Sequence, residues 1–178
     1  MPANALSNCG FNMISNDRNM RIHFKHDIRM HLDQEHRELL KSLKSLSLIR
    51  GSVGESALNL LKALEPHVSE EEKTVIPLLS SIGSLMEGKV GRKELSRLSL
   101  LGNKLTDAYT EFLKEHSDID AKAEKLLEMA KKTGNEWAVP TIEGLRHHIF
   151  LEELLLYPFS ILVGKYAAMI VSENRGNH

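Results

Sequence analysis

Two stretches of the sequence decide the fold: residues 67–77 read HVSEEEKTVIP and residues 148–158 read HIFLEELLLYP. Both follow the pattern His-x3-Glu-Glu-x4-Pro, and they begin 81 residues apart. Upstream of each copy lies a Glu-His dipeptide, at positions 35–36 and 115–116. The chain therefore looks like two copies of one helix pair, with a lone histidine on the first helix and His-x3-Glu on the second.

The His-x3-Glu spacing places both side chains on one face of a helix. Positions i and i+4 lie about 40° apart around an α-helix and about 6 Å apart along it, so imidazole and carboxylate can converge on one ion or on two adjacent ions. The neighbours at three- and four-residue steps are apolar, such as Leu39 near His36 and Leu145 near His148. These polar groups therefore face the core, where metal coordination would offset the unfavourable free energy of burying them unpaired.

The pattern predicts a site for two divalent cations, because one ion cannot easily take six ligands from four helices. Two divalent ions bridged by two carboxylates leave a net positive site that can hold hydroxide, peroxide or another anion. Imidazole and carboxylate without thiolate suit Fe(II), and would also take Mn or Zn. The predicted ligands are His36, His67, Glu71, His116, His148 and Glu152, with Glu71 and Glu152 as the bridges.

Apolar residues recur at three- and four-residue steps along the rest of the chain, and strand signals are missing. We expect an all-α, up-down-up-down four-helix bundle, since long helices joined by short loops pack as antiparallel neighbours. Pro66 and Pro77 should kink or break the second helix, and Gly134 should end the third. The expected helices cover residues 21–48, 55–85, 92–132 and 140–157, and a short extra helical segment after Pro158 runs to 173.

Composition fits one globular domain of 178 residues, with a polar N-terminal arm over residues 1–20 and the bundle over residues 21–178. The net charge of −1 speaks against nucleic acid and anionic lipid as partners. The single Cys9 excludes an internal disulfide. The arm lacks a basic start and an apolar run, and the most apolar stretch, residues 159–171, is too short to span a bilayer. We therefore expect a soluble, cytoplasmic protein.

A lone histidine on the first and third helices, with His-x3-Glu on the second and fourth, resembles the hemerythrin-like (HHE cation-binding) family from about His23 to Pro158. The resemblance implies a non-haem di-iron centre with an oxo, hydroxo or water bridge, held by the six ligands named above. It implies binding of dioxygen or nitric oxide as a sensor, buffer or carrier, with a separate output partner for a sensor. The competing ferritin-like pattern has its Glu and His in the reverse order.

The chain departs from oxygen-carrying hemerythrins at Asp120, where those proteins have a second histidine one turn after the third-helix ligand. Asp120 either serves as an oxygen ligand or leaves one iron poorer in nitrogen. The departure makes an alternative function plausible: a di-iron redox enzyme or iron-handling protein that reduces peroxide, oxidises Fe(II) or donates iron for iron–sulfur cluster repair. A purely structural helical adaptor is a third reading.

The roles of four further side chains stay open. Glu72 and Glu153 lie about 100° from the bridging glutamates, which favours an outer hydrogen-bonding or solvated role over direct ligation. His31 would add a ligand only if the first helix bends. His147 fits the surface better, because its i+4 partner is Leu151.

Aromatic and apolar residues are expected to pack rather than to react. Tyr157 and Trp137 should fill space near the bundle ends. Tyr109 should also pack, although it lies about two turns before His116 and could approach the site. The apolar segment after Pro158 could cap the bundle or form a homodimer contact.

Overall fold

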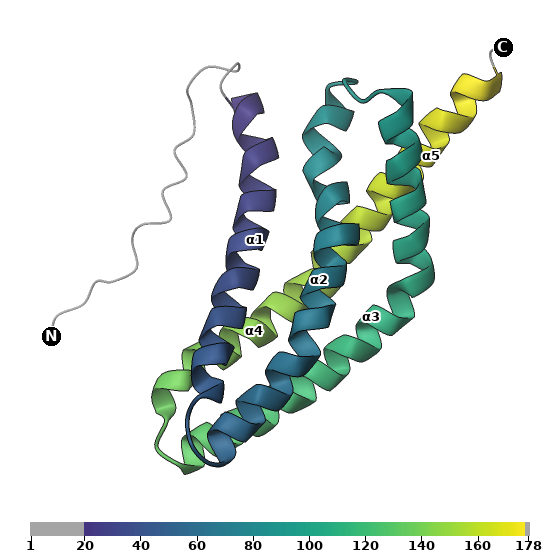
Figure 1. Ribbon diagram of the computed structural model, residues 1–178. Coiled ribbons are helices and arrows are strands. Elements are labelled where there is room, and N and C mark those ends of the chain that lie inside the picture. The colour runs from purple at the N-terminus through teal and green to yellow at the C-terminus, as the bar shows by residue number, and fades with distance from the viewer. Residues whose placement is uncertain (1–19, 177–178) are drawn as a thin grey trace, which may run out of the picture.

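The computed structural model describes residues 20–176, and describes side chains for residues 28–173. Three helices come first: α1 (Met20–Ser47), α2 (Ser52–Met86) and α3 (Arg92–Lys132). The fourth is a composite of η1 (Glu136–Ala138), α4 (Val139–Leu151), η2 (Glu152–Leu156) and α5 (Tyr157–Gly176). Short loops connect these four long elements, which pack side by side (Figure 1). The described residues contain no strand, so the expected all-α four-helix bundle is confirmed. The predicted arm over residues 1–20 lies almost wholly outside them.

Helix ends follow the local turn chemistry. At the end of α3, Gly134 has a φ of 73°, and the Asn135 amide donates to the Ala130 carbonyl at 2.8 Å. This is the glycine-dependent closure that satisfies the last free carbonyls of a helix. It confirms the predicted stop, and Gly88 ends α2 in the same way with a φ of 64°.

The prolines do not interrupt the helices that contain them. Pro66 and Pro77 lie inside α2, which continues through both of them. Pro158 was expected to kink the fourth helix or to begin a short further segment; the helix there contains the π turn η2, in which the Tyr157 amide donates to the Glu152 carbonyl. Because a proline ring clashes with the carbonyl four residues earlier, the wider π turn just before Pro158 lets the helix continue.

The core consists of two apolar clusters. One gathers the loop end of α1 and α2 with the end of α3 and with α4, around Leu43, Leu64 and Leu126. The other gathers the opposite half of α2 and α3 with α5, around Leu78, Leu98 and Leu105. Along every helix, the predicted ligands fall between members of the two clusters. The polar groups therefore form one layer across the middle of an otherwise apolar core.

Two glycines let α3 and α5 approach closely. A Cβ added at Gly102 would lie 2.4 Å from the Cα of Gly164, and the reverse holds at Gly164. Gly144 in α4 is different, since a Cβ there would meet nothing within 4 Å.

We therefore expect Gly102→Ala to lower the free energy of unfolding by about 1–3 kcal/mol, as overpacking usually does, although alanine is the better helix former. Denaturant unfolding would measure it. Gly144→Ala is the matched control and should raise stability by up to about 1 kcal/mol. Equal effects of the two substitutions would contradict the close helix contact.

Residues 136–173 form one helix that is long and apolar enough, by length and composition, to cross a membrane. The apolar stretch over residues 159–171 was expected to be too short to span a bilayer, but it continues the preceding helix, and the whole helix reaches this length. Only 22% of the most apolar 18-residue window is buried in the protein. An apolar face of this helix is thus left uncovered by the described residues.

Candidate metal centre

All six predicted ligands meet inside the bundle. Each of the four long elements contributes at least one of them, and none is more than 8% exposed. We call this group the His–Glu cluster; its members are His36, His67, Glu71, His116, His148 and Glu152. Buried imidazoles and carboxylates in such number need partners or a bound cation to offset their desolvation.

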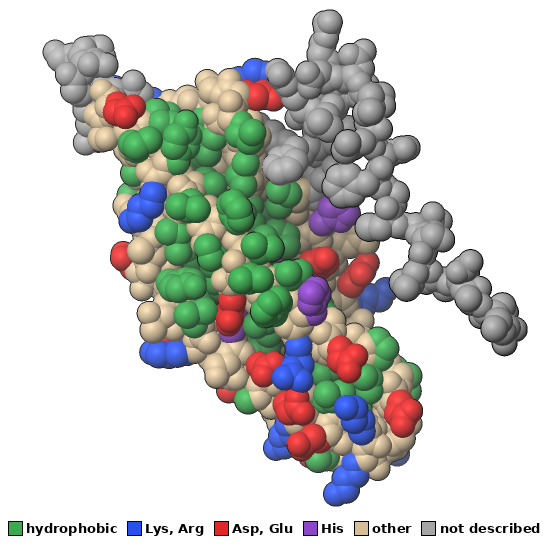
Figure 2. All heavy atoms as spheres, turned by 180° about the vertical axis from the view of Figure 1, so that it is seen from behind, with side chains coloured by type: hydrophobic (Ala, Val, Ile, Leu, Met, Phe, Trp, Pro, Cys, Tyr) green, Lys and Arg blue, Asp and Glu red, His purple; other side chains and the backbone are tan. Residues whose placement is uncertain are grey.

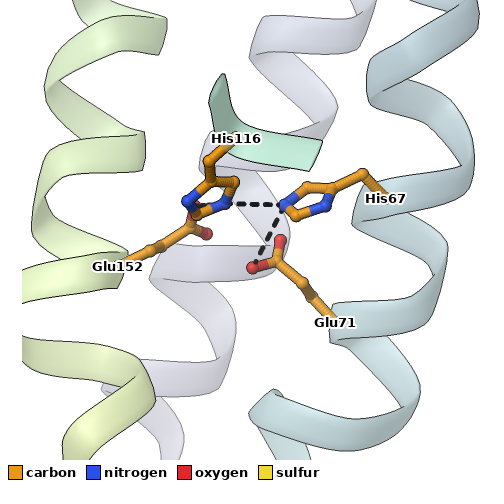
Figure 3. A group of neighbouring side chains, drawn as sticks. All are labelled: His67, Glu71, His116 and Glu152. Carbon is orange, nitrogen blue, oxygen red and sulfur yellow. Dashed lines mark hydrogen bonds and ion pairs between the residues drawn. The ribbon is translucent and has the colours of Figure 1, made fainter. Parts of the chain in front are cut away.

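The cluster contains two groups whose possible ligand atoms lie within 4.8 Å of one another. Figure 3 shows the first, in which His67, Glu71, His116 and Glu152 point toward one another. The second consists of His36, His148 and Glu152. Glu152 belongs to both groups, so its carboxylate can join them.

Each carboxylate of the cluster faces two pairs of histidines, which are His67 with His116 and His36 with His148. Glu152 Oε1 lies 2.9 Å from His148 Nε2, and its Oε2 lies 3.4 Å from His116 Nε2. Glu71 Oε1 and Oε2 lie 3.6 Å from His67 Nε2 and His36 Nε2 respectively. Glu71 Oε2 is buried without a hydrogen-bond partner among the described residues. A carboxylate with one oxygen toward each pair suits a bridging role.

The histidine nitrogens face one another in pairs. His67 Nε2 lies 2.9 Å from His116 Nε2, and His36 Nε2 lies 3.1 Å from His148 Nε2. His67 and His116 use their other nitrogen, Nδ1, toward Glu115 and Glu153. When Nδ1 donates its hydrogen to a carboxylate, the neutral ring keeps a bare lone pair on Nε2. Two lone pairs at this distance repel each other unless a proton or a metal cation lies between them.

An outer set of carboxylates orients three of the four imidazoles. Glu115 accepts from His67 Nδ1 at 2.7 Å, Glu153 from His116 Nδ1 at 3.0 Å, and Glu35 from His148 Nδ1 at 3.2 Å. Such contacts fix the ring orientation and tautomer of a metal-binding histidine and raise its basicity. Sequence reasoning had not assigned Glu35 and Glu115 a role, although both belong to the repeated Glu-His dipeptide that could have indicated one.

Glu115→Ala should weaken metal binding by about 10- to 100-fold, the usual effect of losing a carboxylate that holds a ligand histidine. A competition titration with a metal-binding dye would measure the change. Glu111→Ala is the control, because Glu111 lies one turn away on α3 and contacts Lys114 instead. Unchanged affinity in the Glu115 variant would show that this contact does not support binding.

The electrostatics of the cluster favour positive charge. Burial alone lowers the pKa of His67, but the hydrogen bond and charge of Glu71, with smaller effects of Glu115 and Glu152, raise it from 6.5 to about 9. Burial raises the pKa of Glu152, yet hydrogen bonds from His116, His148 and His36 hold it well below its usual value. Histidines that bind a proton this tightly beside buried carboxylates can also bind a metal cation.

Other candidate residues lie away from the cluster. Asp120 binds Arg146, with 2.7 Å between its Oδ1 and the Arg146 Nε, so the alternative of an oxygen ligand at this position is wrong. Glu72, His31 and His147 are exposed. Of the four open residues, only Glu153 reaches the cluster, in the outer role that its spacing favoured.

Tyr157 contacts the His–Glu cluster, which sequence reasoning did not predict. It was expected to fill space near a bundle end, but its hydroxyl donates to Glu71 Oε1 at 2.5 Å and its side chain is fully buried. In a regular helix, Tyr157 would lie about 140° around from Glu152. The π turn adds a residue to that turn and brings the two onto one side. Trp137, by contrast, is 62% exposed and fills no core space, whereas Tyr109 packs edge-on against Tyr157 as expected.

A surface pocket of about 440 Å³ lies beside His148, between α1 and α4, and includes Glu35 and Leu39 in its lining. His148 is the most exposed member of the cluster, at 8%. The pocket therefore reaches the cluster at His148.

A bundle of four helices whose buried middle layer consists of imidazoles and carboxylates defines a metal-binding helical protein. The family model of the hemerythrin HHE cation-binding domain matches residues 27–160. The chain belongs to this family, as its repeated motif suggested. No curated protein and no solved structure gives a significant match.

Proposed function

We propose that the chain binds two iron ions in the His–Glu cluster and captures dioxygen or nitric oxide as a sensor, buffer or carrier. The observation that carries this proposal is the pairing of His67 with His116 and of His36 with His148, with both carboxylates between the pairs. His67 and His116 would hold one ion and His36 and His148 the other, bridged by Glu71 and Glu152.

Each ion would then have four protein ligands, two imidazoles and two bridging carboxylates. Ferrous iron accepts more ligands than this, so positions remain for a small molecule. Iron supplies the affinity for a diatomic ligand, whereas the chain orients the imidazoles through Glu35, Glu115 and Glu153 and excludes bulk water by burial. The pocket beside His148 supports entry of a small solute.

The alternative, a redox enzyme or an iron-handling protein, rested on extra oxygens at Asp120, Glu72 and Glu153. Asp120 binds Arg146 and Glu72 is exposed, so two of these three residues do not bring an oxygen atom to the cluster. The binding function is therefore the better supported one.

Anaerobic loading with Fe(II), followed by exposure to dioxygen or nitric oxide, tests the proposal. We expect two irons per chain and a new visible charge-transfer band with at least one gas. Loaded protein that shows no band with either gas would overturn the binding function. Sustained turnover with excess peroxide or Fe(II) would favour the alternative, and the exposed His147→Ala variant should behave as the wild type.

A further inference from the structure

Tyr157 Oη lies at ligand distances from three members of the cluster. It is 2.5 Å from Glu71 Oε1, 2.9 Å from His116 Nε2 and 3.4 Å from His67 Nε2. Ligand atoms at about 2.1 Å from one metal are about 3.0 Å apart at right angles and about 3.4 Å apart at tetrahedral angles. The distances to the two histidine nitrogens match this range, so relative to His67 and His116 the phenol oxygen lies where a neighbouring ligand atom would.

Ring contacts with its neighbours hold the tyrosine in this place. Its ring stacks on the His116 imidazole at 5.3 Å and packs edge-on against Phe112. The π turn directs it inward, as described above. The corresponding position of the first motif copy is Ile76, which is apolar. The second copy thus adds an oxygen group beside His67 and His116 that the first copy does not offer to the other pair.

We propose that Tyr157 Oη is a further ligand of the cation held by His67 and His116, an inference that rests on the proposed function. The phenolic proton leaves for solvent when the metal binds, as protons do when metal ligands are deprotonated. The two ions of the pair are then chemically inequivalent, because only one has a phenolate ligand.

Resonance Raman and visible spectra of the full chain loaded with Fe(III) test this assignment. We expect a phenolate-to-iron band whose vibrations shift when tyrosine is ring-deuterated. Tyr157→Phe should abolish the band while two irons remain bound, and Tyr109→Phe should keep it. Deuterium labelling needs no substitution, so the test survives an unstable variant. Two bound irons without a phenolate signal overturn the ligand role alone, whereas failure to bind iron overturns the proposed function as well.

A second observation is independent of the metal site: the uncovered face of the C-terminal helix is a regular apolar seam. Its members are 43–62% exposed and are spaced alternately four and three residues apart; they are Leu155, Phe159, Leu162, Tyr166 and Met169. This is the spacing of a helix that packs against another helix. The opposite face, with Gly164 and Ala167, is buried in the bundle. Figure 2 shows this side of the molecule, whose upper part is a broad apolar area with few charged side chains.

The seam is large enough for a stable dimer. With Phe150 and Leu154, which are both 55% exposed, it comprises seven half-exposed side chains. A large side chain has about 200 Å² of surface, and about half of it is exposed at each of these seven positions. Roughly 700 Å² of each copy would therefore be covered, close to the ~800 Å² per partner of a standard interface. A single uncharged helix face can pair with itself across a twofold axis.

A membrane suits this helix less well than a second copy does. The same helix carries His148, Glu152 and Tyr157, so crossing a bilayer would pull them out of the His–Glu cluster. We infer that the seam is the interface of a homodimer.

Size-exclusion chromatography with light scattering on the full chain should give twice the 20.1 kDa mass. Leu162→Glu should raise the dimer dissociation constant at least about 30-fold, as for a central interface residue, and keep its metal. Leu100→Glu, at a 70% exposed position on α3, should stay dimeric. A monomeric wild type, a dimeric Leu162→Glu variant, or a wild type that floats with phosphatidylcholine–phosphatidylglycerol vesicles as a monomer would each overturn the inference.

Discussion

Glu152→Ala should reduce the metal content from two ions per chain to well under one. Glu152 is the carboxylate shared by both groups of possible ligands, with one oxygen toward His148 and the other toward His116. Without it, both sites lose an anionic ligand at once, and the remaining imidazoles lose the charge that balances a cation between them. Elemental analysis of freshly purified protein would count iron, manganese and zinc.

The neighbouring motif offers a matched control. Glu72 directly follows Glu71, the other proposed bridge, but is exposed, so we expect Glu72→Ala to keep the metal content of the wild type. Glu152→Gln keeps the shape and removes the charge, and we expect it to lose metal almost as fully. If Glu152→Ala retained two ions, the shared bridge would be wrong, although single sites could still exist.

Removing the metal should lower stability strongly and make it depend on pH. Each ion present at a hundred times its dissociation constant contributes about 2.7 kcal/mol to the free energy of unfolding. In the metal-free protein the pKa of His67 is raised from 6.5 to about 9, mainly by Glu71 against the opposing effect of burial. A raised pKa stabilises the fold fully below about pH 6.5, and this stability is lost as the pH rises through about 9.

Urea unfolding of chelator-treated protein at about pH 6 and about pH 9 would measure this loss, on the order of 3 kcal/mol. The metal-loaded protein should show little change over the same window, because the metal replaces the proton. His67→Ala should remove much of the slope in the metal-free protein, and the exposed His147→Ala should leave it unchanged. A metal-free protein whose stability rises toward pH 9 would contradict the charge arrangement of the cluster.

The repeat in the sequence was enough to predict the helix pairs and the convergence of six side chains. Residues four apart share one face of any α-helix, so His67 with Glu71 and His148 with Glu152 had to point the same way. Apolar neighbours on the same face directed that face inward. The stop at Gly134 was equally local, because glycine readily adopts the left-handed conformation needed there.

Contacts between helices could not be predicted in this way. Asp120 lies one turn after His116 and was expected to share its face, but its carboxylate binds Arg146 on α4. Glu35 and Glu115 bind histidines of other helices, so their role depends on how the helices are packed.

Tyr157 shows most clearly why helical periodicity alone did not predict every residue at the cluster. The α-helical rotation of about 100° per residue turns this side chain away from Glu152, and only the π turn next to Pro158 returns it to the cluster. Helical periodicity, encoded residue by residue, determined which side chains share a face of one helix. A single extra residue in one turn, and the partners available on neighbouring helices, determined which of them meet.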